Sequence, residues 1–445
     1  MSESISQVAD LGLESGDQTP LAVKGEQMSS RGDVRAKADA LADTLRAEGA
    51  LRVAVRSDDP VDIVRTLAAG AAAGADVFIA HTNIPAEKFD AIVAERGVQF
   101  VVGAEDKATG VSGGDAPQNA PSGRVFMMTS GTTGMPKIAE HSLTSLMARA
   151  LNSTKSQDAA GARWLLTYQP TGFAGVQVIL TATLTKGLIV SPKERNPGGF
   201  AEAAKTWQVS QISGTPTFWR SFLMAASPKE MALKQITLGG EASDQATLDR
   251  ISAAFPDARV THVYASTEAG VVFAVHDGKA GFPVEWLEQE GPDIKQGTQV
   301  RIRDGYLQIK TPNAMRGYLS GAEQPHLDDG WLGTADLCEI REDRVFILGR
   351  QDSTINVGGS KVYPLAVETE LLSIPGVVEA RVYGVSNPIA GSLVGADVVI
   401  ADGEDPKEAR GRILAAAREK LAGYQVPRVF KIVDKIEVRE SGKKG

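Results

Sequence analysis

The sequence predicts an α/β fold in three parts: a large N-terminal domain of layered α/β sheets, a small β-rich subdomain, and a C-terminal α+β domain. Up to about residue 240, short apolar runs alternate with helical patterns, which favours parallel sheets covered on both faces. After about residue 296, short alternating runs flank turn residues, as in hairpins. Beyond Arg350 the order of strands and helices changes again, over a length that can fold alone.

Capping residues and apolar spacing predict the first elements. Residues 1–28 are polar, rich in Ser, Gly, Glu and Gln, and are expected to form a flexible segment. Ser29 or Ser30 can cap a helix whose apolar residues repeat at helical spacing until Gly49 ends it. The pattern then predicts a strand at 51–55, a helix at 62–73, a strand at 76–80, a helix at 86–96 and a strand at 99–102.

The same periodicities predict the later elements. Asp304 and Gly305, between two short alternating runs, predict a hairpin. Residues 107–124, rich in Gly and Pro, are typical of a linker. Further strands are expected at 125–128, 164–166, 188–190, 211–213 and 235–238, and the C-terminal part should hold helices at 365–373 and 406–421, strands at 377–385 and 396–400, and a final strand.

The composition narrows the class of protein. A chain of 445 residues is too long for one core, so two or more domains are expected. A net charge of −8 argues against a general nucleic-acid binder, and no run approaches the roughly 20 apolar residues of a membrane span. The N-terminus lacks the pattern of a secretion signal. Cys338, the only cysteine, excludes an intrachain disulfide, so a cytoplasmic enzyme is expected.

A segment rich in hydroxyl groups and glycine follows the apolar run at 125–128. It reads Thr129-Ser130-Gly131-Thr132-Thr133-Gly134-Met135-Pro136-Lys137. Glycines let the backbone approach a ligand, N–H and hydroxyl groups donate to phosphate oxygens, and lysine adds positive charge. The spacing is not that of a Walker A loop, because a proline precedes the lysine and Ile138 follows it. The segment therefore predicts a phosphate-binding loop of another kind.

This segment resembles the phosphate loop of the adenylate-forming superfamily, which comprises acyl- and aryl-CoA synthetases, peptide-synthetase adenylation domains and luciferases. The resemblance extends from about residue 30 to the end of the chain, with the other motifs in the family's order. The matching segments are Gly239-Gly240-Glu241, Tyr264-Ala265-Ser266-Thr267-Glu268, Trp331 to Asp336, Gly349-Arg350-Gln351-Asp352, Ile355 to Pro364 with Glu368, and Ser441-Gly442-Lys443.

The resemblance implies that ATP, with Mg²⁺, activates a carboxylic acid as an acyl-adenylate and releases pyrophosphate, after which the acyl group passes to a pantetheine thiol. Such catalysis is mostly positioning and charge neutralisation. Thr267 would donate to the α-phosphate, Glu268 would bind Mg²⁺, and Lys443 would bridge the carboxylate and the α-phosphate. The other phosphates would be held by Thr129, Ser130, Gly131, Thr132, Thr133, Gly134 and Lys137.

The nucleoside would lie between the remaining motifs. Tyr264 would stack on adenine, Asp336 would accept hydrogen bonds from the ribose, and Arg350 would reach the ribose or a phosphate, or else form only a surface ion pair. The adenine side would be completed by Gly239, Gly240, Glu241 and Ala265. The family usually has glycine at the positions of Ala265 and Ala335, so both methyl groups are expected to narrow the nucleotide site.

The same resemblance implies a moving C-terminal domain. Residues 353–445 would rotate relative to residues 29–349, of which about 296–349 are the β-rich subdomain. The hinge would be 350–352, with Asp352 as the residue that absorbs the rotation. Gly358, Gly359 and Lys361 would then line the tunnel of the thiol.

The acid-binding residues are expected at Phe173, Gln177, Thr215 and Gly240, with Pro216, Phe218 and Trp219 as further wall residues. Amino-acid-activating relatives have an aspartate where this chain has Ala174, and an unpaired buried ammonium is costly, so an α-amino acid is disfavoured. The histidine that many acyl-CoA synthetases have near Phe173 is absent from this segment. The aromatic residues suggest a compact or aromatic acid.

Several alternatives stay open at this point. The thiol can belong to CoA or to the phosphopantetheine of an acyl carrier protein, and a homodimer is possible. The protein can also be a catalytically weak family member that acts by binding, or a phosphotransferase that releases ADP. Retention of Glu268 and Lys443 favours the acid–thiol ligase.

Overall fold

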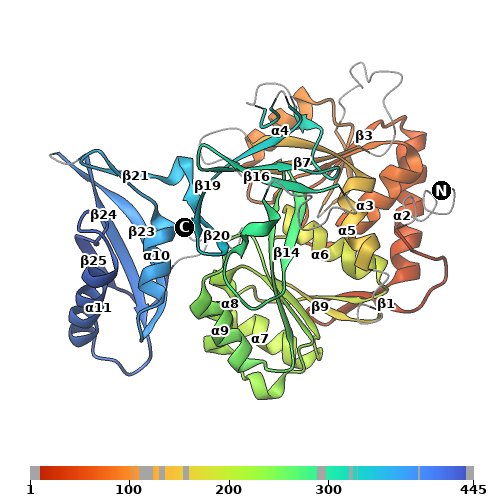
Figure 1. The fold of residues 1–445 in the computed structure, drawn as a ribbon. Helices are drawn as coiled ribbons and strands as arrows, with labels where there is room; N and C mark the ends of the chain where they lie inside the picture. The colour runs from red at the N-terminus through yellow and green to blue at the C-terminus, as the bar shows by residue number, and fades with distance from the viewer. Residues whose placement is uncertain are drawn as a thin grey trace.

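The computed structural model describes residues 11–103, 105–109, 124–129, 136–153, 160–287, 297–319, 324–327, 329–388 and 391–436. Within these residues the strands form four sheets, two large ones and two of five strands each. In Figure 1 the large sheets and their helices lie to the right, and a separate C-terminal unit lies to the left. This arrangement confirms the predicted α/β architecture with a β-rich part.

The first large sheet, sheet A, has the order β14-β13-β12-β11-β9-β10-β1-β2. Strands β9, β11, β12 and β13 run parallel, so their carboxyl ends meet at one edge. The strands are β1 Pro20–Lys24, β2 Gln27–Ser30, β9 Arg163–Leu166, β10 Leu188–Ser191, β11 Gln211–Gly214, β12 Gln235–Leu238, β13 Arg259–Ser266 and β14 Gly270–Val275. The helices that follow them are α6 Phe173–Leu184, α7 Pro197–Thr206, α8 Pro216–Ala225, the short η2 Pro228–Glu230 and α9 Gln245–Ala254.

The second large sheet, sheet B, has the order β18-β8-β7-β4-β3-β5-β6. Strands β3, β4, β5 and β7 are parallel, whereas β8 returns antiparallel to β7 and pairs with the short β18. Its strands are β3 Arg52–Val55, β4 Asp76–Ile79, β5 Phe100–Val102, β6 Lys107–Ala108, β7 Arg124–Thr129, β8 Lys137–Ser142 and β18 Gly317–Tyr318. Its helices are α2 Arg31–Ala47, α3 Pro60–Ala73, α4 Ala86–Glu95 and α5 Leu143–Ser153.

Local sequence explains where these helices begin. Ser30 caps α2 through a capping box with Asp33, which confirms the predicted start. Asp59 caps α3, Pro60 occupies its first turn, and Gly74 ends it in the left-handed conformation. Helix α6 is apolar on nearly all sides because it lies in the core, where it packs with α3 and α5.

The prediction of a flexible segment at 1–28 is wrong for the part that the structure describes. Strand β1 pairs in parallel with β10, and Leu11 and Leu21 are fully buried. Arg31, also fully buried, donates to the carbonyls of Thr183 at 2.9 Å and Gly187 at 2.8 Å. These long-range contacts order a segment whose composition alone is polar.

The β-rich part forms sheet C, with the order β15-β20-β19-β17-β16. Asp304 and Gly305, with φ of 52° and 81°, connect β16 and β17, which confirms the predicted hairpin. The strands are β15 Phe282–Pro283, β16 Gln299–Arg303, β17 Tyr306–Lys310, β19 Leu332–Arg341 and β20 Arg344–Arg350, and the short helices η3 Val284–Trp286 and η5 Gln351–Ser353 lie beside them.

The C-terminal unit has its own sheet D and its own core of residues between 355 and 430. Its strands are β21 Ile355–Val357, β22 Ser360–Val362, β23 Val377–Asn387, β24 Gly391–Ile400 and β25 Val429–Ile432, and its helices are α10 Pro364–Leu372 and α11 Pro406–Lys420. Strand β23 approaches α8, where a cavity of about 350 Å³ is lined by Arg220, Leu223, Met224 and Arg250 on one side and Gly376 to Val378 on the other. The C-terminal unit therefore contacts the α8 side of the N-terminal part around this cavity.

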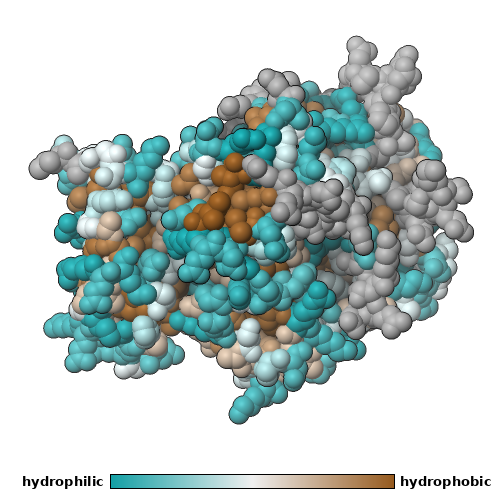
Figure 2. All heavy atoms as spheres, viewed as in Figure 1, coloured by the Kyte–Doolittle hydropathy of each residue, from teal (hydrophilic) through white to brown (hydrophobic). Residues whose placement is uncertain are grey.

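Figure 2 shows a surface that is mostly hydrophilic on this face, with hydrophobic side chains gathered near its centre, around sheet C. Ile340 on β19 is one of the exposed hydrophobic residues, with 52% of its surface accessible. In the described part of the chain, no helix has both the length and the apolar composition needed to cross a membrane.

Candidate active site

Several of the predicted site residues lie at the carboxyl ends of parallel strands. Strand β7 ends at Thr129, and β8 begins at Lys137 directly opposite it. In sheet A, the strands β11, β12 and β13 end at the segments that hold Thr215, Gly239 and Thr267. Ligands of open α/β sheets bind at this edge. The loop between β7 and β8 lies outside the described residues, and so does Lys443. The predicted residues in this loop are Ser130, Gly131, Thr132, Thr133 and Gly134.

The turn between β13 and β14 carries Thr267 and Glu268 and is held from two sides. His141 on β8 donates through Nε2 to the carbonyl oxygen of Thr267 at 2.8 Å, and the Met315 amide donates to the carbonyl of Glu268 at 2.8 Å. The Tyr318 hydroxyl donates to Oε1 of Glu268. The backbone and side chain of this turn are therefore fixed before any ligand arrives.

Tyr318 and His141 were not predicted as site residues. On β8, residues two apart face the same side, so Lys137 and His141 share a face, and Tyr318 pairs with Ala139 between them. The Lys137 ammonium lies 5.1 Å from the centre of the Tyr318 ring. The alternation of side chains along β8 could have indicated His141. No local signal indicates Tyr318, because its short strand β18 pairs with β8, which lies far from it in the sequence.

His141 is a neutral residue in this position. Burial lowers its pKa from 6.5 to about 4, against the opposing effects of Thr267 and Glu268. Since its Nε2 carries the hydrogen that Thr267 accepts, Nδ1 is an acceptor, and it has no hydrogen-bond partner among the described residues. Its ring lies 6.1 Å from that of Phe173. A histidine from another strand therefore lies beside the Phe173 segment, which carries none itself.

The nucleoside-side residues meet at sheet C. The Tyr264 hydroxyl donates to Oδ2 of Asp336, and its ring stacks on Phe273 with the centroids 5.4 Å apart. Burial and Asp336 raise the pKa of Tyr264 well above its usual value. Arg350 lies opposite Asp336 in the β19–β20 pairing. Burial alone would lower the pKa of Arg350, but Asp336, Asp352 and Glu268 raise it.

The turn Gly239-Gly240-Glu241 packs closely. A Cβ at Gly239 would lie 2.8 Å from Val263, and Gly240 has a φ of +85° and stands beside the methyl group of Thr215. These two positions therefore require glycine. The Glu241 carboxylate accepts from the Thr217 amide at 3.2 Å and from its hydroxyl at 2.7 Å, so it holds the N-terminus of α8.

Of the predicted acid-binding residues, some lie near His141 or Gly240, and others are buried in the core. Phe173 begins α6 near His141, and Thr215 caps α8 beside Gly240. Gln177 is buried, and its amide nitrogen donates to the Leu146 carbonyl at 2.9 Å. The expectation that Trp219 lines the acid pocket is wrong: it is fully buried in the core beside sheet A. Pro216 is also buried, whereas Phe218 packs against Trp219, Phe200 and Phe222.

The predicted hinge and tunnel residues lie on the surface. Nε of Arg350 is 3.5 Å from Oδ1 of Asp352, and both side chains are more than half exposed. Gly358 and Gly359, with φ of 57° and 89°, form the exposed turn between β21 and β22, and no neighbouring atom lies within 4 Å of a Cβ placed on either. Lys361 is exposed as well.

The two alanines that replace the family's glycines differ in conformation. Ala335 has a φ of +60°, in the left-handed region that costs an L-residue about 1–2 kcal/mol. Ala265 adopts a negative φ at an irregularity of the β13–β14 pairing. The substitution therefore strains the backbone at Ala335 only.

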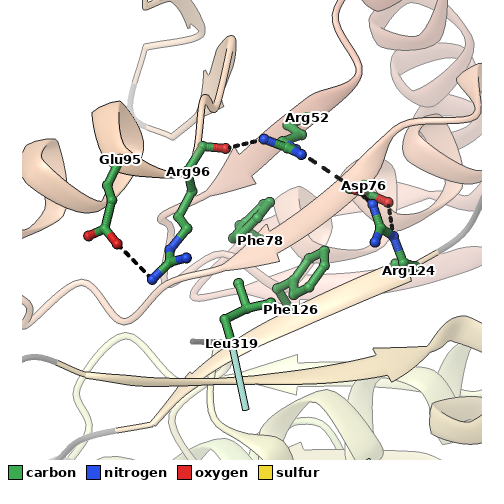
Figure 3. A pocket seen from close by; sticks show the side chains of 8 residues that line it. All are labelled: Arg52, Asp76, Phe78, Glu95, Arg96, Arg124, Phe126 and Leu319. Carbon is green, nitrogen blue, oxygen red and sulfur yellow. Dashed lines mark hydrogen bonds and ion pairs between the residues drawn. The ribbon is translucent and has the colours of Figure 1, made fainter. Parts of the chain in front are cut away.

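A separate pocket of about 170 Å³ lies at the opposite edge of sheet B (Figure 3). Arg52, Asp76 and Arg124 begin β3, β4 and β7, whereas the predicted site lies where such strands end. Arg124 donates through Nε to Asp76 at 2.9 Å, and the exposed Glu95 pairs with Arg96 at 2.8 Å. The stacked rings of Phe78 and Phe126 form its apolar wall, 4.5 Å apart. The Arg124–Asp76 pair ties the beginnings of β7 and β4 together, on the edge away from the predicted site.

Comparison with solved structures shows the fold. MatB from Rhodopseudomonas palustris with ATP bound is 22% identical with a TM-score of 0.77, and the match covers 98% of this chain and 97% of that chain. O-succinylbenzoate coenzyme A synthetase from Bacillus subtilis, in complex with ATP and a magnesium ion, is 21% identical with a TM-score of 0.73, covering 99% and 97%.

Comparison of sequences shows the family. The pattern of the AMP-binding enzymes matches residues 111–319, and that of the AMP-binding enzyme C-terminal domain matches residues 366–443. The feruloyl-CoA synthase of an Amycolatopsis species is 30% identical over 400 residues, which cover 83% of this chain and 77% of the relative. The chain therefore belongs to the family of AMP-binding, adenylate-forming enzymes.

Proposed function

We propose that this adenylate-forming acid–thiol ligase activates a compact or aromatic carboxylic acid with ATP and transfers the acyl group to the thiol of CoA. The carboxylate oxygen would attack the α-phosphorus, pyrophosphate would leave, and the thiol would then displace AMP from the acyl carbon. The observation that carries the proposal is that Tyr318 contacts both Lys137 and Glu268, while Tyr264, four residues before Glu268 in the chain, donates to Asp336.

The residues at this edge suit a polyphosphate and a metal ion. Two anionic partners must meet at the α-phosphorus, so cations nearby lower the barrier. Lys137 and Arg350 would supply positive charge at the phosphates, and Thr267 a hydroxyl donor for the α-phosphate. Thr129 and the loop to Gly134 would wrap the other phosphates.

The site fits Mg²⁺ bound through one protein carboxylate. No cluster of three or more His, Cys, Asp or Glu side chains suited to a metal occurs in the described ranges. Mg²⁺ commonly binds one or two carboxylates together with substrate phosphates and water. Glu268 accepts from Tyr318 at Oε1, and Oε2 accepts no hydrogen bond from a described residue. This oxygen would face the metal, which supplies charge neutralisation when bound.

The nucleoside would bind between sheets A and C. The Asp336 carboxylate, oriented by the Tyr264 hydroxyl, would accept from the ribose, and Arg350 stands beside it. Gly239, Gly240 and Ala265 would border the adenine. The Glu241 carboxylate already accepts a hydrogen bond from Thr217. Glu241 would therefore hold the turn at Gly239 and Gly240 in place and would not contact the adenine through its carboxylate.

The acid would bind near Phe173. Phe173 and the neutral His141 carry no charge themselves, and Ala174 offers no carboxylate for an ammonium group. Thr215 and Gly240 would form the opposite wall. These residues support an aromatic or compact acid, and the name of the feruloyl-CoA synthase is consistent with an aromatic one.

We also propose that residues 353–445 move about a hinge at 350–352, with Asp352 as the pivot. Lys443 would serve the first half-reaction, and Gly358, Gly359 and Lys361 would reach the site for the second. The exposed position of that turn is compatible with such a movement.

A single assay tests the proposal. The purified protein is incubated with ATP, Mg²⁺ and labelled pyrophosphate, together with one acid at a time from hydroxycinnamates, benzoates, short-chain acids, dicarboxylates and amino acids. We expect acid-dependent incorporation of label into ATP with an aromatic or compact acid, and thioester formation when CoA is added. Thioester formation only with a holo-carrier protein would change the acceptor. Absence of exchange with every acid, or release of ADP, would contradict the proposal.

A further inference from the structure

Tyr318 is held in place by its backbone on both sides. The Leu319 amide donates to the Ile138 carbonyl at 2.9 Å, and the Arg316 amide donates to the Glu140 carbonyl at 2.7 Å. On the outer side, the Gln324 side chain accepts from the Tyr318 amide at 2.8 Å and donates to its carbonyl at 2.9 Å. The backbone of this strand of two residues is thereby hydrogen-bonded on both sides of Tyr318.

The side chain of Tyr318 contacts two groups of the proposed nucleotide site. Its ring face lies under the Lys137 ammonium, 5.1 Å away, where the negative π face attracts a cation. Its hydroxyl donates to Oε1 of Glu268. The ring therefore meets the phosphate-loop lysine at its face and the metal-binding glutamate at its edge.

This geometry has two consequences for a carboxylate that binds a metal. A hydrogen bond on Oε1 restricts the rotation of Glu268 and leaves Oε2 for the ion, and a donor to an ionised acceptor is among the stronger hydrogen bonds. The ring also gives the Lys137 ammonium an attractive position over its π face.

We propose, on the basis of the function proposed above, that Tyr318 is a positioning residue that aims Glu268 at the metal and holds Lys137 at the phosphates. Two variants distinguish the effect of the hydroxyl contact from the effect of the ring contact. Tyr318→Phe keeps the ring under Lys137 and removes only the hydroxyl, whereas Tyr318→Leu removes both contacts.

The test measures binding without turnover. Mn²⁺ serves as the probe and is titrated by electron paramagnetic resonance into protein saturated with the ATP analogue that has a methylene bridge between the α- and β-phosphates. We expect Tyr318→Phe to weaken Mn²⁺ binding about tenfold, the effect of one hydrogen bond to a charged group. Metal-free binding of the analogue should change less than twofold in Tyr318→Phe and fall clearly in Tyr318→Leu.

Kinetics and controls complete the test. In the exchange assay, Tyr318→Phe should raise the Mg²⁺ concentration for half-maximal rate by a similar factor, and saturating Mg²⁺ should restore most of the rate. Tyr424→Phe, at a tyrosine that is 45% exposed in the C-terminal unit, is the matched control and should match the wild type. Equal melting temperatures of Tyr318→Phe and the wild type separate positioning from unfolding.

The outcomes distinguish this proposal from the function itself. Unchanged Mn²⁺ affinity and unchanged Mg²⁺ dependence in Tyr318→Phe would overturn the role of Tyr318, whatever the wild type catalyses. The role would also be overturned if Tyr318→Phe loses activity only because part of the protein is unfolded, as a lower melting temperature would show, while the folded fraction binds Mn²⁺ with normal affinity. A wild-type protein that binds no metal–nucleotide would overturn both proposals.

Discussion

Glu379 gives the sharpest prediction about how the C-terminal unit is docked. Nε of Arg220, on α8, donates to Oε2 of Glu379, on β23, at 2.7 Å, and both side chains are at most 6% exposed. Arg220 also contacts Asp244 and the Thr217 hydroxyl, each at 3.0 Å. Arg220 thus joins the C-terminal unit to the residue that binds Glu241.

Glu379→Gln removes the charge and keeps the shape. Breaking a buried ion pair costs about 3–5 kcal/mol when the remaining charge is left alone. Here Asp244 still neutralises Arg220, and the new amide oxygen can still accept from it, so we expect a loss of about 1–2 kcal/mol in the docking free energy. That corresponds to about five- to thirtyfold in the population of the docked arrangement.

Distance measurements between spin labels test this prediction. With Cys338 replaced by serine, labels on the exposed Lys229 and Lys407 report the separation of η2, which follows α8, and α11, before and after ATP is added. Glu404→Gln is the control, because its partner Arg412 belongs to the same unit and the pair is partly exposed. Distance distributions of Glu379→Gln that equal those of the wild type and of the control would refute the reasoning.

Three further predictions concern single residues. Ala335→Gly should stabilise the protein by about 0.5–1 kcal/mol, since relief of the left-handed strain exceeds the entropy cost of glycine; a lower melting temperature would contradict this. His141 has a pKa near 4 in the folded protein and 6.5 in the unfolded chain, so between these pH values only the unfolded chain binds the proton. Lowering the pH from 6.5 to 5 should therefore cost about 2 kcal/mol of the free energy of unfolding. Chemical denaturation should show a weaker pH dependence in His141→Gln. Asp336→Asn should raise the KM for ATP about tenfold or more while the KM for the acid stays nearly constant; equal changes in both would argue against a ribose contact.

Much of the fold follows from local sequence. The start of α2 is encoded by Ser30 and Asp33, and the β16–β17 hairpin by Asp304 and Gly305. The order of residues 11–28 could not be read in this way, because β1 is stabilised by pairing with β10, more than 150 residues away in the chain, and β2 is stabilised by pairing with β1. Local periodicity contains no information about such a partner.

The candidate site shows the same division. Motifs indicated Glu268, Asp336 and Lys137 through the resemblance to a family. Trp219 was wrongly placed in the acid pocket, because an aromatic residue near a motif serves a core as readily as a ligand, and α8 turns it inward. Tyr318 was missed because its contacts come from the pairing of β18 with β8.

The origin of one oxygen atom in the released AMP shows whether the carboxylate attacks the α-phosphorus. An aromatic acid that supports exchange is labelled with ¹⁸O in its carboxylate and turned over with ATP, Mg²⁺ and CoA. If the carboxylate attacks the α-phosphorus, cleavage of the acyl–oxygen bond by the thiol leaves one ¹⁸O in AMP, which mass spectrometry detects. AMP without ¹⁸O, or ADP as the nucleotide product, would contradict the account.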